Sequence, residues 1–148
     1  MVIEALGAEA WNNKLFSFYH SSMPNEDLKD ILTEFRKPDS NTRLLIATIA
    51  FGIGINIPDI KYVIHWGAAT SVDEYWQEVG RAAINGKPAH AIMYATPISL
   101  INADQAMKDI CSNLNMCIRK QVLDCLAVTG DCQLSYEDPS TCCSSCKV

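Results

Sequence analysis

Four short apolar runs of strand length recur along the first two thirds of the chain, separated by segments of helical periodicity. They are Leu15–His20, Leu44–Ala50, Tyr62–His65 and Ala89–Tyr94. Continuous apolar runs of this length are typical of strands that are covered on both faces, as in a parallel sheet. The pattern therefore predicts buried, parallel strands.

Helical patterns fill the spaces between these runs. In the segment 24–37, the residues Leu28, Ile31, Leu32 and Phe35 form one apolar stripe at i, i+3, i+4 and i+7. Ser71 and Glu74 form a capping box, which predicts a second helix through about Ala83. In such a box the serine side chain accepts a hydrogen bond from a free backbone N–H, and the glutamate side chain reaches back to the start of the helix. Strands that alternate with helices predict an α/β fold, with a parallel sheet flanked by helices.

Composition divides the chain in two. All seven cysteines lie after residue 110, so we expect one domain over residues 1–96 and a smaller cysteine-containing subdomain over 97–148, each with its own core. A content of 49% apolar and 20% charged residues is that of an ordinary globular protein. The net charge of −5 argues by itself against strong nucleic-acid binding. Two local basic pairs, Arg36-Lys37 and Arg119-Lys120, could contact phosphates, but solvated charge on a helix end or face is the favoured interpretation of both.

Two classes of protein are disfavoured by what the sequence lacks. No apolar run approaches the roughly 20 residues that a membrane-spanning helix needs, and Glu4 and Glu9 interrupt an N-terminus without a basic flank. We therefore expect neither a membrane partner nor secretion. No serine or cysteine occupies a nucleophile elbow, which disfavours acyl-transfer chemistry.

Three ordered motifs carry a family resemblance that runs from about Phe16 to the C-terminus. Residues 77–86, Gln-Glu-Val-Gly-Arg-Ala-Ala-Ile-Asn-Gly, resemble the last motif of RecQ-type DNA helicases, Gln-Glu-x-Gly-Arg-Ala-Gly-Arg-Asp-Gly. Residues 46–60 are similar to the preceding RecQ motif, and 63–67 follow it as the family's strand ending in histidine does. Residues 18–23 resemble the family's Tyr-His-Ala-Gly-Leu turn.

This resemblance implies most of the second RecA-like lobe of an ATP-dependent 3′–5′ DNA helicase. It implies ATP with Mg²⁺ as cofactors, in a site shared with a first RecA-like lobe in cis or in trans, and single-stranded or forked DNA as the substrate. The sequence has no phosphate loop and no Asp-Glu-x-His box, so we expect a fragment or a degenerate copy. Family members act in DNA repair and recombination, which implies the nucleus in a eukaryote and the cytoplasm otherwise.

For the nucleotide site, the resemblance implies Gln77, Gly80 and Arg81 as binding residues, with Gln77 and Arg81 also catalytic. The alternative for Arg81 is a surface ion pair with Glu78 or Asp73. Ile84 replaces the family's second arginine, and it cannot supply the planar cation that stabilises a transferring phosphoryl group. We therefore expect this chain alone to be inactive. The alternative function is a non-catalytic nucleic-acid-binding or regulatory remnant.

The resemblance also implies DNA-backbone contacts, at His20, Thr48, Gly52, Gly54 and Asn56. The two glycines would permit close approach of the backbone. Taken alone they would favour a tight strand-to-helix connection, but the resemblance favours the DNA contact. Histidines at strand ends, here His20 and His65, are more often structural than functional. Asp59 either caps the next turn or meets the nucleotide, and we favour the cap.

The cysteines point to a structural zinc site. Cys143 and Cys146 have the spacing with which two thiolates chelate one ion in a tight turn, and the resemblance implies the set Cys117, Cys132, Cys143 and Cys146. Cys142 could replace Cys143. We expect Cys125 to be buried, because it lies within an apolar helical stripe. Disulfides are disfavoured by the odd cysteine count and the absence of a signal peptide.

Overall fold

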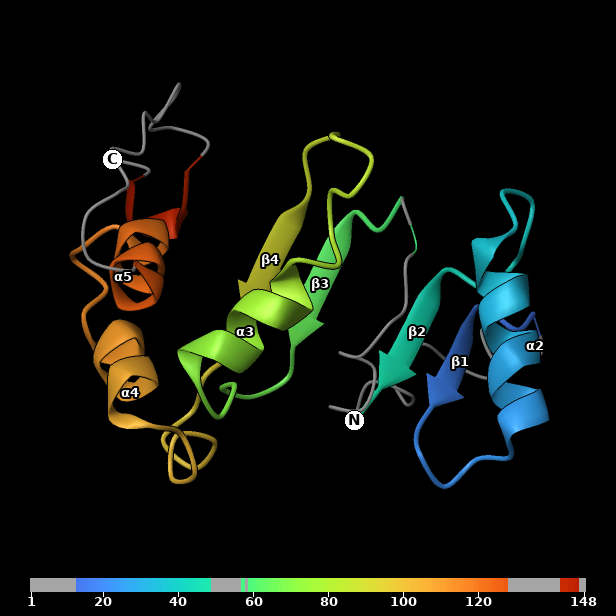
Figure 1. Ribbon diagram of the computed structural model, residues 1–148, viewed down its shortest axis with the longest axis horizontal. Coiled ribbons are helices and arrows are strands. Elements are labelled where there is room, and N and C mark those ends of the chain that lie inside the picture. Colours follow the sequence, from blue (N-terminus) through green and yellow to red (C-terminus); the bar gives the residue numbers. More distant parts are fainter. Residues whose placement is uncertain (1–12, 49–56, 58, 128–141, 147–148) are drawn as a thin grey trace. The chain divides into compact units, whose positions relative to one another are not determined.

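The computed structural model describes residues 13–48, 57, 59–127 and 142–146 (Figure 1). The chain divides into two compact units, Met1–Ile57 and Pro58–Val148, which are described separately. The domain boundary predicted between residues 96 and 97 lies inside the second unit and stays a prediction about this chain.

The first unit contains one parallel strand pair and the helix that connects it. β1 (Phe16–Tyr19) pairs with β2 (Leu44–Ala47) in the register Phe16↔Leu44, and α2 (Asn25–Arg36) joins them. Acidic residues in the first turn of α2 and Arg36 in its last turn oppose the helix dipole at both ends. All three elements were predicted, and the parallel pairing is confirmed.

The second unit repeats this arrangement with a shorter helix. β3 (Tyr62–His65) pairs in parallel with β4 (His90–Met93), in the register Tyr62↔His90, and α3 (Val72–Val79) lies between them in the sequence. The strand predicted over 62–65 is confirmed to the residue. Since strand and helix alternate in both units, the predicted α/β class with parallel pairing is confirmed.

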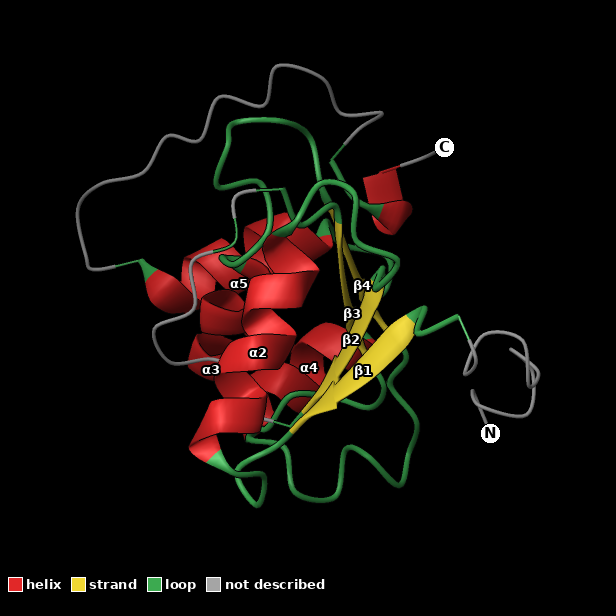
Figure 2. Cartoon of the chain, turned by 90° about the vertical axis from the view of Figure 1, so that its right-hand side faces the viewer, coloured by secondary structure: helices red, strands yellow, loops and turns green. Residues whose placement is uncertain are grey.

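The described tail of the second unit is helical (Figure 2). It contains α4 (Gln105–Ser112), α5 (Ile118–Leu126) and the short 3-10 helix η3 (Ser144–Cys146). Asp104 caps α4, because its carboxylate accepts a 2.7 Å hydrogen bond from the Met107 N–H.

One apolar core joins this tail to the α/β part of the second unit. Its buried members come from α3, α4 and α5 and from the segments that lead into α3 and α4: Ala69, Val72, Ala103, Met107, Ile110 and Val122. Met107 is completely inaccessible to solvent. The expectation of separate cores on either side of residue 96 was therefore wrong, because α4 and α5 bury their apolar faces against α3. Among the described residues, no helix is both long and apolar enough to cross a membrane.

Candidate nucleotide-facing segment and thiol cluster

The helix that precedes the Arg81 segment begins as its capping box predicts. The Ser71 hydroxyl accepts a 3.2 Å hydrogen bond from the Glu74 N–H. The other half of the box differs from the prediction, because the Glu74 carboxylate accepts a hydrogen bond from the Thr70 hydroxyl instead of reaching back to the backbone of Ser71. Either contact gives the Glu74 carboxylate a hydrogen-bond partner. The helix begins after Ser71, as predicted.

The helix ends at Val79, four residues before the predicted end at Ala83. Ala83 has φ +59°, in the left-handed region, which is incompatible with a continuing right-handed helix. Its N–H donates a 3.4 Å hydrogen bond to the Ile60 carbonyl just before β3. This long-range contact redirects the chain, so the segment 80–86 returns to the amino end of β3.

This return brings two predicted motifs together. The end of the motif over residues 46–60 and the segment after α3 meet through the bond between Ala83 and Ile60. Arg81 is half-buried in this turn, while Gln77, Gly80 and Ile84 are exposed, Ile84 by 43%. Asp59 is exposed in the turn before β3, and its role as a cap or nucleotide contact stays a prediction. The segment thus places one cation, Arg81, beside the amino end of β3, with the apolar Ile84 exposed in the same turn.

A contact between His65 and Glu78 holds this helix against the end of β3. The His65 Nε2 and the Glu78 Oε2 lie 2.5 Å apart, and the two side chains are only 11% and 22% exposed. The His65 ring also packs against the Tyr75 ring, with centroids 5.3 Å apart. Burial raises the pKa of Tyr75. The structural alternative for His65 is therefore supported by its contacts.

The partner of His65 was not foreseen from the sequence. A signal was available, because Glu78 lies three residues after Tyr75, on the side of the helix that faces the strand. A carboxylate on a buried helix face needs a polar partner. The carbonyl of Glu78 also accepts the Arg81 N–H at 3.1 Å, so fixing Glu78 fixes the turn in which Arg81 lies.

The predicted DNA-contact residues lie partly outside the described residues. His20 and Thr48 directly follow β1 and β2, and the Thr48 N–H donates a 3.2 Å hydrogen bond to the Tyr19 carbonyl. Since the strands are parallel and in register, the structure brings His20 and Thr48 to the same carboxyl edge, with Thr48 exposed and His20 half-buried. Gly52, Gly54 and Asn56 lie outside the described residues.

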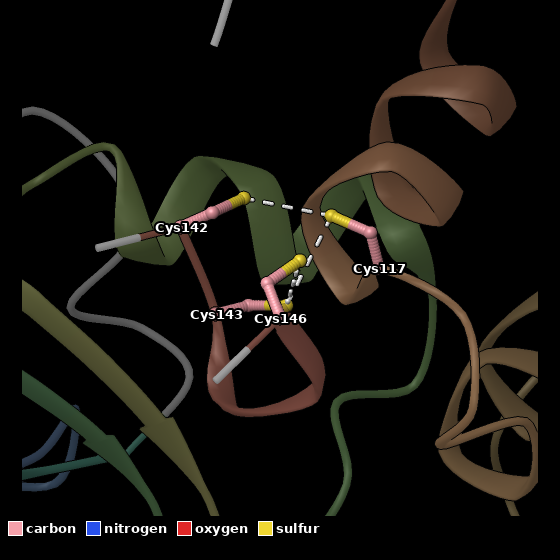
Figure 3. A group of neighbouring side chains, drawn as sticks. All are labelled: Cys117, Cys142, Cys143 and Cys146. Carbon is pink, nitrogen blue, oxygen red and sulfur yellow. Dashed lines mark hydrogen bonds between the residues drawn. The ribbon is translucent and has the colours of Figure 1, made fainter. Parts of the chain in front are cut away.

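Four thiols gather at the start of α5 (Figure 3). Cys117 comes from the N-cap of α5, whereas Cys142, Cys143 and Cys146 come from the short segment around η3. The sulfur atoms all lie within 4.8 Å of one another. Such a donor set fits Zn²⁺, which prefers four thiolates at tetrahedral positions about 2.3 Å away.

The electrostatics of the cluster favour ionised sulfur at Cys143. Burial opposes its ionisation, but hydrogen bonding with the backbone of Ile118, with the Cys146 thiol and with the backbone of Ser145 and Cys146 lowers the pKa of Cys143 to about 6. Hydrogen bonds with Cys117 and Cys143 raise the pKa of Cys146 to about 12. Cys143 thus holds a thiolate more readily than Cys142, whose pKa burial raises, and than Cys146. A bound cation would displace the remaining thiol protons.

The cluster agrees with the prediction at Cys117, Cys143 and Cys146. Cys132 lies outside the described residues, and Cys142 joins the cluster although it had been considered only as a replacement for Cys143. Cys125 is exposed, so the expectation that it is buried was wrong. The face of α5 that packs inward centres on Val122, and Cys125 lies at the margin of that face.

A family model agrees with this arrangement. The model of the family described as "Helicase conserved C-terminal domain" matches residues 3–86. This range includes β1, β2, β3 and the whole Arg81 segment, but not β4. The chain belongs to this family. Its matches to helicases of RecQ name confirm the resemblance carried by the three motifs.

Three curated relatives illustrate the match. The chain is 30% identical over 132 residues to "ATP-dependent helicase wrn-1" of Caenorhabditis elegans, covering 82% of this chain and 12% of that protein. It is 34% identical over 92 residues to "ATP-dependent DNA helicase RecQ" of Pasteurella multocida, covering 61% and 14%. It is 35% identical over 79 residues to "ATP-dependent DNA helicase Q4" of Homo sapiens, covering 53% and 6%. The chain thus spans a small fraction of the length of each of these relatives.

Two solved structures share the fold. The C-terminal domain of the DEAD-box protein Dbp5 superposes with a TM-score of 0.55 at 20% identity, covering 73% of this chain and 62% of that one. A variant of S. cerevisiae Dbp5, bound to RNA and ADP BeF3, gives a TM-score of 0.56 at 21% identity, covering 83% and 30%. At this identity the likeness shows the fold alone, a helicase C-terminal lobe.

Proposed function

We propose that this chain supplies the C-terminal motor lobe of an ATP-dependent, 3′–5′ DNA helicase of RecQ type. In this role it contributes part of the ATP site between two lobes and contacts the DNA backbone. The observation that carries the proposal is the turn after α3, in which Arg81 lies beside the end of the preceding motif through the bond between Ala83 and Ile60. The curated relatives, which are named as ATP-dependent DNA helicases, support it.

Arg81 would meet the charge that develops on the terminal phosphoryl group of ATP held with Mg²⁺ on a first lobe. Gln77 and Gly80 would line the same cleft. The contact between the His65 ring and the Glu78 carboxyl group would hold the helix so that Arg81 keeps its position. At the carboxyl ends of β1 and β2, His20 and Thr48 would contact DNA phosphates, and residues of this kind position the strand without reading sequence.

The thiol cluster would hold one structural Zn²⁺. All four positions would be sulfur, so no position would remain for a water molecule, and the ion would order the chain around α5 instead of taking part in hydrolysis. Zinc in small modules contributes a large share of the folding free energy.

A lobe transplant tests the motor role. Residues 14–146 would replace the corresponding part of a RecQ relative that has an intact first lobe, and DNA-stimulated ATP hydrolysis and unwinding of duplexes with 3′ or 5′ tails would be measured. We expect slow hydrolysis, because Ile84 stands in place of the family's second arginine, and Arg81→Ala should abolish it. Unwinding should start only from the 3′ tail. Equal unwinding from both tails, or hydrolysis indifferent to Arg81→Ala, would contradict the proposal.

DNA contact is tested on the chain itself. Binding of a fluorescent single-stranded oligonucleotide should be weak, with a salt slope of about −0.7 per phosphate neutralised. Thr48→Val should weaken it, whereas Thr33→Val is the matched control, because Thr33 is exposed on α2 and its hydroxyl donates to the Lys29 carbonyl within the helix. Equal losses in both variants would refute the contact at Thr48.

A second candidate function is favoured by Ile84. This exposed apolar residue occupies the position of the family's second arginine, so a partner lobe would meet one cation instead of two. The chain would then be a non-catalytic regulatory or nucleic-acid-binding remnant. A transplant that folds and binds DNA but does not hydrolyse ATP until Ile84 is changed to arginine would support this second function.

A further inference from the structure

One face of the β3–β4 pair carries aromatic rings that no described element of the second unit covers. Side chains alternate between the two faces of a strand, and register partners in a parallel pair share a face. Positions 62, 64 and 66 therefore lie on the same face as positions 90, 92 and 94. We call this surface the ring face, and its members are Tyr62, Ile64, Trp66, His90, Ile92 and Tyr94.

The side chains of the ring face are highly exposed for residues of their size. Trp66 is 81% exposed, Tyr62 58%, Tyr94 55% and Ile64 52%. Single exposed apolar residues are common on every protein, but large ones that gather on one surface mark a binding site. The ring face is therefore a candidate binding surface.

Charge differs between the two faces of the strand pair. His65 points away from the ring face and contacts Glu78 of α3, so α3 and its carboxylates lie on the opposite side of the strands (Figure 1). The ring face has no carboxylate among its six positions. Near the amino ends of the strands, the exposed Lys61 and Lys87 outnumber one described carboxylate, Asp59. The ring face can therefore receive a polyanion without repulsion from side chains of its own.

The rings form two pairs, one at each end of the strands. Tyr62 and His90 are stacked, with centroids 5.2 Å apart and an angle of 16° between the ring planes. The Trp66 and Tyr94 centroids lie 5.6 Å apart, but the ring planes are inclined by 52°, so neither ring covers the face of the other. The Tyr94 N–H donates a 3.0 Å hydrogen bond to the His65 carbonyl, which extends the register and keeps Tyr94 beside Trp66.

We propose that the ring face is a stacking platform for the unpaired bases of single-stranded DNA. Trp66 and Tyr94 hold one base, and Tyr62 and His90 hold another. Sheets that bind single strands stack bases on the aromatic side chains of one face, and such stacking tolerates any sequence because every base has a π face. The inference rests on the proposed function, because it adds base contacts to the backbone contacts proposed at His20 and Thr48.

The spacing of the two pairs favours bases over a partner helix. Tyr62 and Trp66 are four residues apart, and a parallel strand advances about 3.3 Å per residue, so the pairs lie about 13 Å apart. Between them lie only the aliphatic side chains of Ile64 and Ile92. Separate flat rings fit separate flat ligands, such as bases of different nucleotides in one strand, whereas the apolar face of a helix docks in a continuous groove.

An abasic strand tests the stacking on the full chain. Affinities are measured by fluorescence anisotropy for an oligothymidylate and for an abasic strand with the same number of phosphates. Phosphate contacts act on both strands, whereas stacking acts only on the strand that has bases. The oligothymidylate should bind roughly 5- to 150-fold more tightly for each stacked base.

Single variants assign this difference to the ring face. Trp66→Ala should weaken binding of the oligothymidylate by roughly 5- to 150-fold and leave binding of the abasic strand unchanged. Its salt slope should also be unchanged, because the ring neutralises no phosphate. Trp66→Phe keeps a ring and should retain most of the affinity. Trp76→Ala is the matched control, because Trp76 is also an exposed tryptophan but lies on α3.

The outcomes separate this inference from the proposed function. Equal binding of the two strands, with a loss in Thr48→Val, overturns the stacking and leaves the backbone contacts intact. Binding of neither strand overturns both. Equal losses in Trp66→Ala and Trp76→Ala also contradict the stacking. A dimer of the chain that only Trp66→Ala dissociates would assign the ring face to a second copy and would overturn the inference as well.

Discussion

The backbone at Ala83 offers a direct test of how the segment after α3 is built. With φ +59°, Ala83 holds its Cβ in the left-handed region, where the clash with the following carbonyl costs about 1–2 kcal/mol. Replacement by glycine removes that clash, but it increases the entropy of the unfolded chain by about 0.5–1 kcal/mol. We therefore expect Ala83→Gly to raise the free energy of unfolding by up to about 1.5 kcal/mol.

The assay is thermal and urea unfolding of the full chain, followed by circular dichroism. In domains of 60–100 residues, 1 kcal/mol corresponds to about 4–8 °C in Tm, so the middle of the expected range corresponds to a rise of about 3–6 °C. Gly86→Ala is the matched control in the opposite direction. Gly86 has φ +75°, and nothing lies within 4 Å of an added Cβ, so the substitution adds backbone strain without a steric contact and should lower the stability by a similar amount.

A third variant separates strain from a general effect of glycine. Ala82 lies next to Ala83 but does not have a positive φ. Ala82→Gly should therefore relieve no strain and should lower the free energy of unfolding by up to about 1 kcal/mol. The reasoning is refuted if Ala83→Gly and Ala82→Gly destabilise the chain equally. It is also refuted if Gly86→Ala leaves the stability unchanged, because left-handed strain would then not determine this turn.

Four further outcomes are expected. Glu78→Ala should lower the free energy of unfolding by about 1–3 kcal/mol, because it leaves the buried His65 ring without its partner; an unchanged urea midpoint would contradict this. Chelation of zinc should unfold the region around α5 and also loosen α3, since the two share one core. The fluorescence of Trp76 on α3 should change; a structural change confined to residues after 96 would contradict the shared core. Zinc should dissociate as the pH falls, because binding requires deprotonated thiols and protons compete for them; zinc content that is constant from neutral to acid pH would exclude a thiolate site. In the lobe transplant, Ile84→Arg combined with Ala83→Gly should raise ATP turnover by roughly 10³- to 10⁵-fold with little change in DNA affinity; normal turnover with Ile84 in place would mean that Arg81 suffices.

Local sequence patterns determined the elements of this fold. The alternation and length of apolar runs located β1 to β4, including Tyr62–His65 to the residue. The capping serine at Ser71 located the start of α3. These features depend on side chains within one turn or one strand, so neighbouring residues in the sequence are enough to predict them. The three motifs also identified the family, because their order and spacing are linear properties of the chain.

Tertiary structure alone decided how distant residues meet. The apolar residues through Ala83 favour a longer helix, and only the bond from Ala83 to Ile60, 23 positions earlier in the chain, accompanies its end at Val79. The pairing of Glu78 with His65 and the burial of α4 and α5 against α3 likewise join separate segments. At the thiol cluster, spacing picked out Cys143 and Cys146, but adjacent residues such as Cys142 and Cys143 cannot be ranked by spacing. Their roles depend on where the backbone directs each sulfur relative to Cys117, and that direction exists only in the folded chain.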